Sequence, residues 1–179
     1  MTQPSRIPHD WLQPQWPAPA GVRALCTTRA GGVSTGPCAS LNLGSHVGDD
    51  PSAVQANRQR LQAVVQGATP GARAVFLNQV HGTAVATINP ATPDGTEADA
   101  CVATQPGAVC TIMVADCLPV LLAHGSGAVV GAAHAGWRGL AGKGGVGVLE
   151  AVFERFKALA LSDKALAAIK NEANGMLAA

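Results

Sequence analysis

The sequence contains no tyrosine, and aromatic residues make up only 3% of it. Proteins that bind single-stranded nucleic acids stack bases on aromatic side chains, so this scarcity argues against that class. Charged residues are also few, at 13%, and the net charge of +1 comes with no basic stripe that would favour nucleic acid. No apolar run approaches the roughly 18 residues of a membrane helix, and the N-terminus lacks the apolar core of a signal peptide. We therefore expect a cytoplasmic protein that binds neither nucleic acid nor a membrane.

Cysteine is present, but in no pattern that builds a structural site by itself. The five cysteines are widely spaced, their number is odd, and none belongs to a C-x-x-C pair. In a cytoplasmic chain of this size these features predict free thiols, of which a special one would be a metal ligand or a nucleophile.

Apolar residues, in contrast, account for 47% of the 179 residues, which suits a buried core and argues against disorder. We predict a single domain over 1–179, with an irregular lead-in over 1–20. The order of the expected elements indicates an α/β (α+β) fold in which mixed β-sheets are flanked by helices and the functional site lies at strand ends.

Two helices are predicted from their caps and apolar stripes. One follows Asp50, a suitable cap, with Pro51 in its first turn and Val54, Leu61 and Val65 on one face. The other is expected over 145–161, and the tail that follows it is expected to be helical as well. Its apolar face is predicted to consist of Val146, Leu149, Phe153 and Phe156.

Short β-prone runs bounded by turn formers predict the strands. The continuous apolar runs among them are expected to be covered on both faces. A loop over 29–50, rich in glycine and serine, is long enough to be functional or flexible. The predicted strands span 22–28, 73–80, 83–88, 108–115, 119–124 and 128–135.

Three motifs each place a metal-binding side chain just after a predicted strand. These are His81 in "NQVHG", Cys117 in "VADCLP" and His134 in "GAAHAGWRG". Neighbouring strand ends would bring them together, and two imidazoles with one thiolate suit tetrahedral Zn²⁺ with a fourth position open for chemistry. The spacing alone favours the other interpretation, in which the histidines are ordinary loop residues and the cysteine is a small buried apolar residue.

Residues beside these motifs have candidate roles of their own. Asp116 is a charged residue between two apolar runs, which points either to catalysis or to a structural cap or ion pair, for example with Arg138. Arg138 could hold an anion such as phosphate through two parallel hydrogen bonds. Trp137 could lie against a flat ring or simply pack. Gly136 and Gly139 would leave the backbone close to a ligand, or form plain turns.

Five motifs in order resemble the laccase-domain family over about 23–150. They are "TTRAGGVSTGP…LNLG.HVGDD", "NQVHG", "EADACV", "ADCLPVLLA" and "HAGWRG". Members of that family were first described as multicopper polyphenol oxidases and later as zinc-dependent purine nucleoside phosphorylases with adenosine deaminase activity. A bacterial member is described as a peptidoglycan-editing factor.

The resemblance implies a role for particular residues. It assigns His81, Cys117 and His134 to zinc, and it places Arg29, Asn42 and His46 in a pocket for substrate or phosphate. For Arg29 and Asn42 the alternative is loop scaffolding, and His46 could be a surface histidine. Members also continue with a segment resembling "GPxIGxxxxEV", which this sequence does not contain. Its C-terminal part is therefore expected to be either shortened or incomplete near Leu161 and Ser162, and a missing segment would remove part of the pocket wall.

The function expected from the residues and the resemblance is a zinc enzyme that acts on purine nucleosides and phosphate. We expect Asp116, Cys117 and His134 to act in catalysis. Two alternatives use other chemistry: a copper-dependent polyphenol oxidase, and an amide hydrolase in peptidoglycan editing with Cys117 as the nucleophile. Copper is the less favoured metal, because the five histidines are isolated and form no His-x-His pair. A binding module merely braced by metal is also disfavoured, since three ligands leave one position open.

Overall fold

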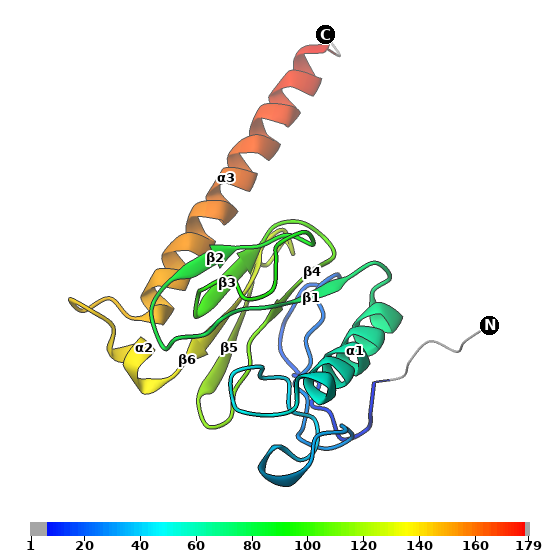
Figure 1. Cartoon of the computed structure of the whole chain (residues 1–179). Coiled ribbons are helices and arrows are strands. Elements are labelled where there is room, and N and C mark those ends of the chain that lie inside the picture. Colours follow the sequence, from blue (N-terminus) through cyan, green and yellow to red (C-terminus); the bar gives the residue numbers. More distant parts are fainter. Residues whose placement is uncertain (1–6, 178–179) are drawn as a thin grey trace.

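A computed structural model describes residues 7–177 of the protein, with side-chain surroundings given as far as residue 162 (Figure 1). After a long irregular N-terminal part, the described chain forms one α-helix, then six strands in succession, then two further α-helices. The N-terminal part contains one short 3₁₀-helix, η1 (Gly36–Cys38). The helices are α1 (Pro51–Ala68), α2 (Trp137–Ala141) and α3 (Val148–Leu177); the strands are β1 (Arg73–Phe76), β2 (Val85–Thr87), β3 (Ala100–Ala103), β4 (Ala108–Thr111), β5 (Leu118–Ala123) and β6 (Val130–Ala135).

The strands form two sheets of different size. The larger has the order β2-β3-β6-β5, with β2 and β3 parallel and the β3–β6 and β6–β5 pairs antiparallel. The smaller consists of the parallel pair β1 and β4. Mixed sheets flanked by helices were predicted, and the α+β architecture is confirmed.

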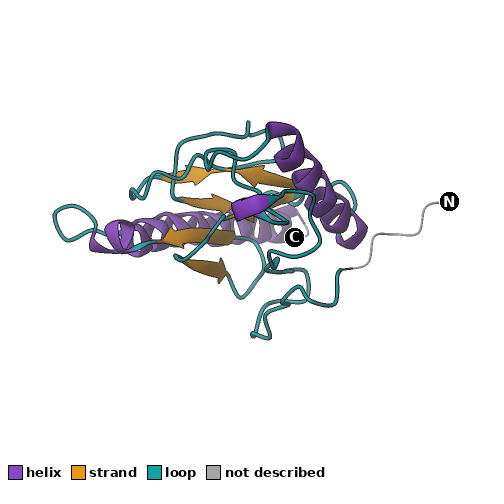
Figure 2. Ribbon diagram, turned by 60° about the horizontal axis from the view of Figure 1, so that its bottom comes forward, coloured by secondary structure: helices purple, strands orange, loops and turns teal. Residues whose placement is uncertain are grey.

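The molecule has four layers, and the side chains that alternate between the two faces of each strand show how they pack together. In β3, Ala100 and Val102 face α3, whereas Cys101 and Ala103 face the smaller sheet. In β1, Val75 lies in the core between the sheets, and its neighbours on either side pack toward α1. Because side chains in a strand point to opposite faces in turn, the order is α3, four-stranded sheet, two-stranded sheet, α1 (Figure 2).

Helix α1 begins as its sequence predicts. The Asp50 carboxylate accepts hydrogen bonds from the backbone N–H groups of Ser52 and Ala53, and Pro51 occupies the first turn. Val54, Leu61 and Val65 are buried as expected, together with Asn57 and Val64.

The second predicted helix needs two corrections. Helix α3 starts at Val148, so Val146 lies before it and is exposed, and Phe153 is exposed as well. The buried stripe consists of Val148, Val152, Phe156 and Ala160. These residues recur at every fourth position, so they lie along one face of the helix. The predicted helical tail is confirmed as far as Leu177, and residues 178 and 179 lie outside the described part.

The strand predictions were wrong at three points. Residues 22–28 form no strand, and only Cys26 pairs, in an isolated bridge with Leu12. The strand β3 was missed, because it is four residues long and follows a turn-rich acidic segment. Finally, β5 is not covered on both faces. It lies at an edge of its sheet, and Leu118 is 61% exposed.

No helix within residues 7–177 is both long and apolar enough to cross a membrane.

Candidate metal centre

The fold brings the side chains of His81, Cys117 and His134 into one cluster. Their potential ligand atoms all lie within 4.8 Å of one another. His81 belongs to the turn between β1 and β2, Cys117 immediately precedes β5, and His134 lies inside β6. The prediction that all three follow strand ends was therefore wrong in detail, although the expected convergence is present.

The register of β5 against β6 explains how Cys117 reaches the two histidines. Pro119 pairs with His134 and Leu118 pairs with Ala135, so Cys117 stands opposite Gly136 at the end of the ladder. On β6, His134 shares a face with Ala132, which belongs to the core between the two sheets. His81 comes from the segment that follows β1 of the smaller sheet, so the cluster lies where the two sheets meet.

One donor separation in the cluster is close to that expected between two ligands of a tetrahedral zinc ion. Cys117 Sγ lies 3.7 Å from His81 Nε2, and the His81 and His134 ring centroids are 4.6 Å apart at an angle of 68°. Zinc–sulfur and zinc–nitrogen bonds at a tetrahedral angle separate their donor atoms by about 3.6 Å. Two nitrogens and one sulfur thus lie close enough together that they could hold a metal ion, and three protein ligands would leave one tetrahedral position for another group.

Gly136 is needed for this close approach. A Cβ atom there would lie 2.8 Å from Cys117 Sγ and 2.9 Å from His81 Cδ2, closer than side-chain carbons normally approach. The glycine was predicted to make room for a ligand; in the structure it makes room for the side chains of Cys117 and His81.

Asp99 is a residue of the cluster that the sequence did not single out. Its fully buried carboxylate accepts a hydrogen bond from His134 Nδ1 at 2.9 Å and from the backbone N–H of His81 at 2.8 Å. An isolated aspartate directly before a short apolar run was the available signal, because a buried charge there needs a specific purpose.

Burial raises the pKa of the Cys117 thiol, and the nearby carboxylates of Asp116 and Asp99 raise it further. Without a cation, the neutral thiol is therefore favoured over the thiolate. A bound cation reverses that balance, since coordination deprotonates a thiol. The raised pKa disfavours Cys117 as a free nucleophile, which needs a lowered pKa.

A family model described as multi-copper polyphenol oxidoreductase laccase matches residues 23–171. The chain belongs to this family. Among its relatives, the purine nucleoside phosphorylase PA4543 of Pseudomonas aeruginosa is 53% identical over 144 residues, which are 80% of this chain and 55% of the relative. The purine nucleoside phosphorylase YfiH of Escherichia coli is 50% identical over 139 residues, 78% of this chain and 54% of the relative.

Solved structures of this laccase family share the fold. The crystal structure of Neisseria meningitidis protein NMB0706 matches with a TM-score of 0.72 and 47% identity, over 83% of this chain and 57% of that chain. YlmD of Geobacillus stearothermophilus matches with a TM-score of 0.66 and 37% identity, over 78% and 54%. The chain spans about half the length of the curated relatives that it matches.

In this member of the family, the predicted pocket residues of the long loop have partners within that loop. Arg29 Nε donates to the Ala39 carbonyl at 2.8 Å. The Asn42 side chain bonds Gly44 in both directions and also donates to Asp49. These contacts agree with the alternative role of Arg29 and Asn42, in which their side chains hold the loop in shape. His46 is exposed, and its pocket role stays a prediction.

The residues next to the cluster are largely open to solvent. Trp137 begins α2 directly after Gly136 and is 72% exposed, and the Arg138 guanidinium lies 5.0 Å from the centre of its ring. Asp116 is exposed beside Cys117, and within the described residues it forms no ion pair with Arg138. An accessible indole and guanidinium therefore follow His134 of the candidate metal site along the chain.

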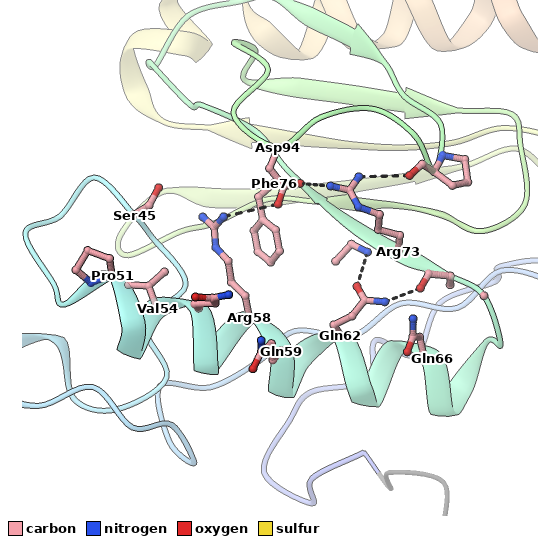
Figure 3. Close-up of a pocket in the computed structure, with 15 residues that line it drawn as sticks. Ser45, Pro51, Val54, Arg58, Gln59, Gln62, Gln66, Arg73, Phe76 and Asp94 are labelled. Carbon is pink, nitrogen blue, oxygen red and sulfur yellow. Dashed lines mark hydrogen bonds and ion pairs between the residues drawn. The ribbon is translucent and has the colours of Figure 1, made fainter.

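A separate open hollow of about 730 Å³ lies between α1 and β1 (Figure 3). Several of its polar side chains already form hydrogen bonds within the protein. Gln62 bonds the backbone of Ala72 and Ala74, and Asp94 accepts from Arg73 and from the Phe76 N–H. These contacts provide hydrogen-bond partners for backbone groups along the free edge of β1. We therefore regard the hollow as structural and the cluster of His81, Cys117 and His134 as the candidate site.

Proposed function

We propose that the protein is a zinc-dependent purine nucleoside phosphorylase. The observation that carries the proposal is the convergence of His81, Cys117 and His134, whose donor atoms lie within 4.8 Å of one another. Relatives named purine nucleoside phosphorylase, 50% and 53% identical to this chain, support the substrate class. The same names imply a purine nucleoside and phosphate as the small-molecule partners.

The three side chains would hold the metal, which supplies Lewis-acid chemistry at its open position when bound. In phosphorolysis, a phosphate oxygen bonds to the anomeric carbon of the ribose. The glycosidic bond to the purine breaks, its electron pair leaves with the base, and the base takes up a proton. Asp116, beside Cys117, is the group that we assign to pass this proton.

The flanking residues are assigned to substrate binding. Arg138 would bind phosphate through two parallel hydrogen bonds, and the exposed Trp137 ring would lie against the purine. Arg29 and Asn42 would shape the loop that borders the pocket, and His46 would contact the substrate. We further propose adenosine, inosine and methylthioadenosine as substrates, with replacement of the adenosine amino group by water as a second reaction.

The test is to incubate the purified, zinc-loaded protein with inosine or adenosine and phosphate, and to follow free base, ribose 1-phosphate and ammonia by chromatography. We expect release of hypoxanthine and adenine that depends on phosphate. His81→Ala should lose both zinc and base release, whereas His124→Ala, at an exposed turn, should keep both. Absence of base and of ammonia with the zinc-loaded protein would contradict the proposal.

Two alternatives have separate tests. A multicopper oxidase needs more donors than the one three-residue cluster found in the described part of the chain. Stoichiometric copper after purification, with oxygen uptake on phenols, would favour it. If Cys117 were instead the nucleophile of an amide hydrolase, a thiol-alkylating reagent would label it equally fast with and without zinc. Protection by zinc would identify it as a ligand.

A further inference from the structure

Four N–H donors surround the buried carboxylate of Asp99. Oδ1 accepts from the His81 backbone at 2.8 Å and from His134 Nδ1 at 2.9 Å. Oδ2 accepts from the Val80 backbone at 3.1 Å and from the Gly82 backbone at 2.7 Å. The carboxylate is fully buried, and no lysine or arginine of the described chain forms an ion pair with it.

A charge buried in this way is costly unless its partners compensate for the lost water. Here every compensating donor belongs either to His134 or to the three-residue turn centred on His81. Asp99 thus contacts two of the three metal-binding residues, and it touches them through atoms that do not themselves bind the metal. We propose that Asp99 is a positioning residue that sets both histidines for the metal; this inference rests on the metal site of the proposed function.

For His134, the hydrogen bond to Asp99 decides which ring nitrogen is left to bind the metal. Nδ1 faces Asp99, so the proton of the neutral ring is held on Nδ1 and the Nε2 lone pair is left for the metal. A carboxylate in this position also fixes the ring orientation and increases the basicity of the ligand. The main chain reinforces the contact, because the His134 N–H donates to the Asp99 carbonyl at 2.7 Å.

For His81, the contact decides the backbone conformation. His81 has a φ of 62°, in the left-handed region that residues other than glycine seldom adopt. The N–H groups of Val80, His81 and Gly82 converge on the carboxylate and form an anion-binding turn. This turn directs the His81 ring toward Cys117, at 3.7 Å from its sulfur.

The tautomer of His134 in the metal-free wild-type protein is the first test, because it needs no substitution. Long-range ¹⁵N–¹H spectra at a pH of about 8.5, where imidazole is ordinarily neutral, report which nitrogen carries the proton. We expect His134 to be protonated on Nδ1 before any metal is added. A proton on Nε2, or an even mixture of the two forms, would overturn the proposal.

The second test compares Asp99→Asn with Asp94→Asn. Asp94 is a matched control, because it also accepts a backbone N–H, from Phe76, but lies at the hollow beside β1. We expect Asp99→Asn to weaken zinc binding about 10- to 100-fold in competition with a chelator, and to alter the visible spectrum of the cobalt-substituted protein. Asp94→Asn should leave both unchanged.

The outcomes separate this inference from the proposed function. Equal zinc affinity and an unchanged cobalt spectrum in a folded Asp99→Asn protein would overturn the positioning role while leaving the metal site intact. A purely structural role would lower the melting temperature of that variant without either change. If Asp99→Asn does not fold, the tautomer of the wild type still decides the matter. A wild type that binds no zinc would contradict the proposed metal site itself, and the metal-free tautomer would remain the test of Asp99.

Discussion

At the scale of single residues, Gly136 is where the metal centre has the least room. Its position opposite Cys117 leaves no space for a side chain, since a Cβ would lie 2.8 Å from Sγ. Gly136→Ala must therefore push Cys117 or His81 out of place. We expect a loss of zinc affinity of at least about tenfold, measured by competition with a chelator, because misplaced ligands forfeit the tetrahedral geometry.

Gly125→Ala is the control for this prediction. A Cβ at Gly125 meets nothing within 4 Å, and this glycine has no positive φ. The control should bind zinc as the wild type does. Wild-type affinity in Gly136→Ala would show that the site tolerates a methyl group and would contradict the crowded geometry described above.

At the scale of elements, α3 has a buried face that differs from the predicted one. Phe156 is buried against the larger sheet, whereas Phe153 is 52% exposed. Phe156→Ala should lower the free energy of unfolding by about 3 to 5 kcal/mol, because it removes a large buried ring and leaves a cavity. Phe153→Ala should change it by less than about 1 kcal/mol. Chemical denaturation of the two variants checks the pair, and equal losses would restore the face predicted from the sequence.

At the scale of the whole molecule, the proposed metal site would connect the two sheets. His81 follows β1 of the smaller sheet, Cys117 immediately precedes β5 of the larger sheet, and His134 lies inside β6. A metal that binds only the folded state stabilises it by about 2.7 kcal/mol at a hundredfold excess over its Kd. For a chain of this length that corresponds to a rise in Tm of about 5 to 10 °C.

Calorimetry with and without zinc tests this rise. His134→Ala should lose it, His124→Ala should keep it, and a chelator should reverse it in the wild type. A wild-type Tm that is indifferent to zinc, or an equal rise in His134→Ala, would mean that the ion does not bind at this cluster.

Local chemistry made some of these features predictable from the sequence. Asp50 and Pro51 predict the start of α1, because helix capping and the fixed φ of proline act within one turn and need no distant partner. His81, Cys117 and His134 were predicted as a set because their residue types match one metal and their motifs resemble one family. In both cases the evidence lies in the identity of the residues.

Tertiary structure decided the features that depend on which segments become neighbours. An apolar run such as 118–123 looks the same in the centre of a sheet and at its edge, and only the strand order exposes Leu118. Asp99 is one aspartate among several until the fold buries it between His134 and the turn at His81. The sequence by itself determined the residue types of the cluster, the first helix and the mixed α/β class. The spacing of those side chains, the contacts of Asp99 with His81 and His134, and the exposed strand required the packing of two sheets, because these properties arise from contacts between residues far apart along the chain.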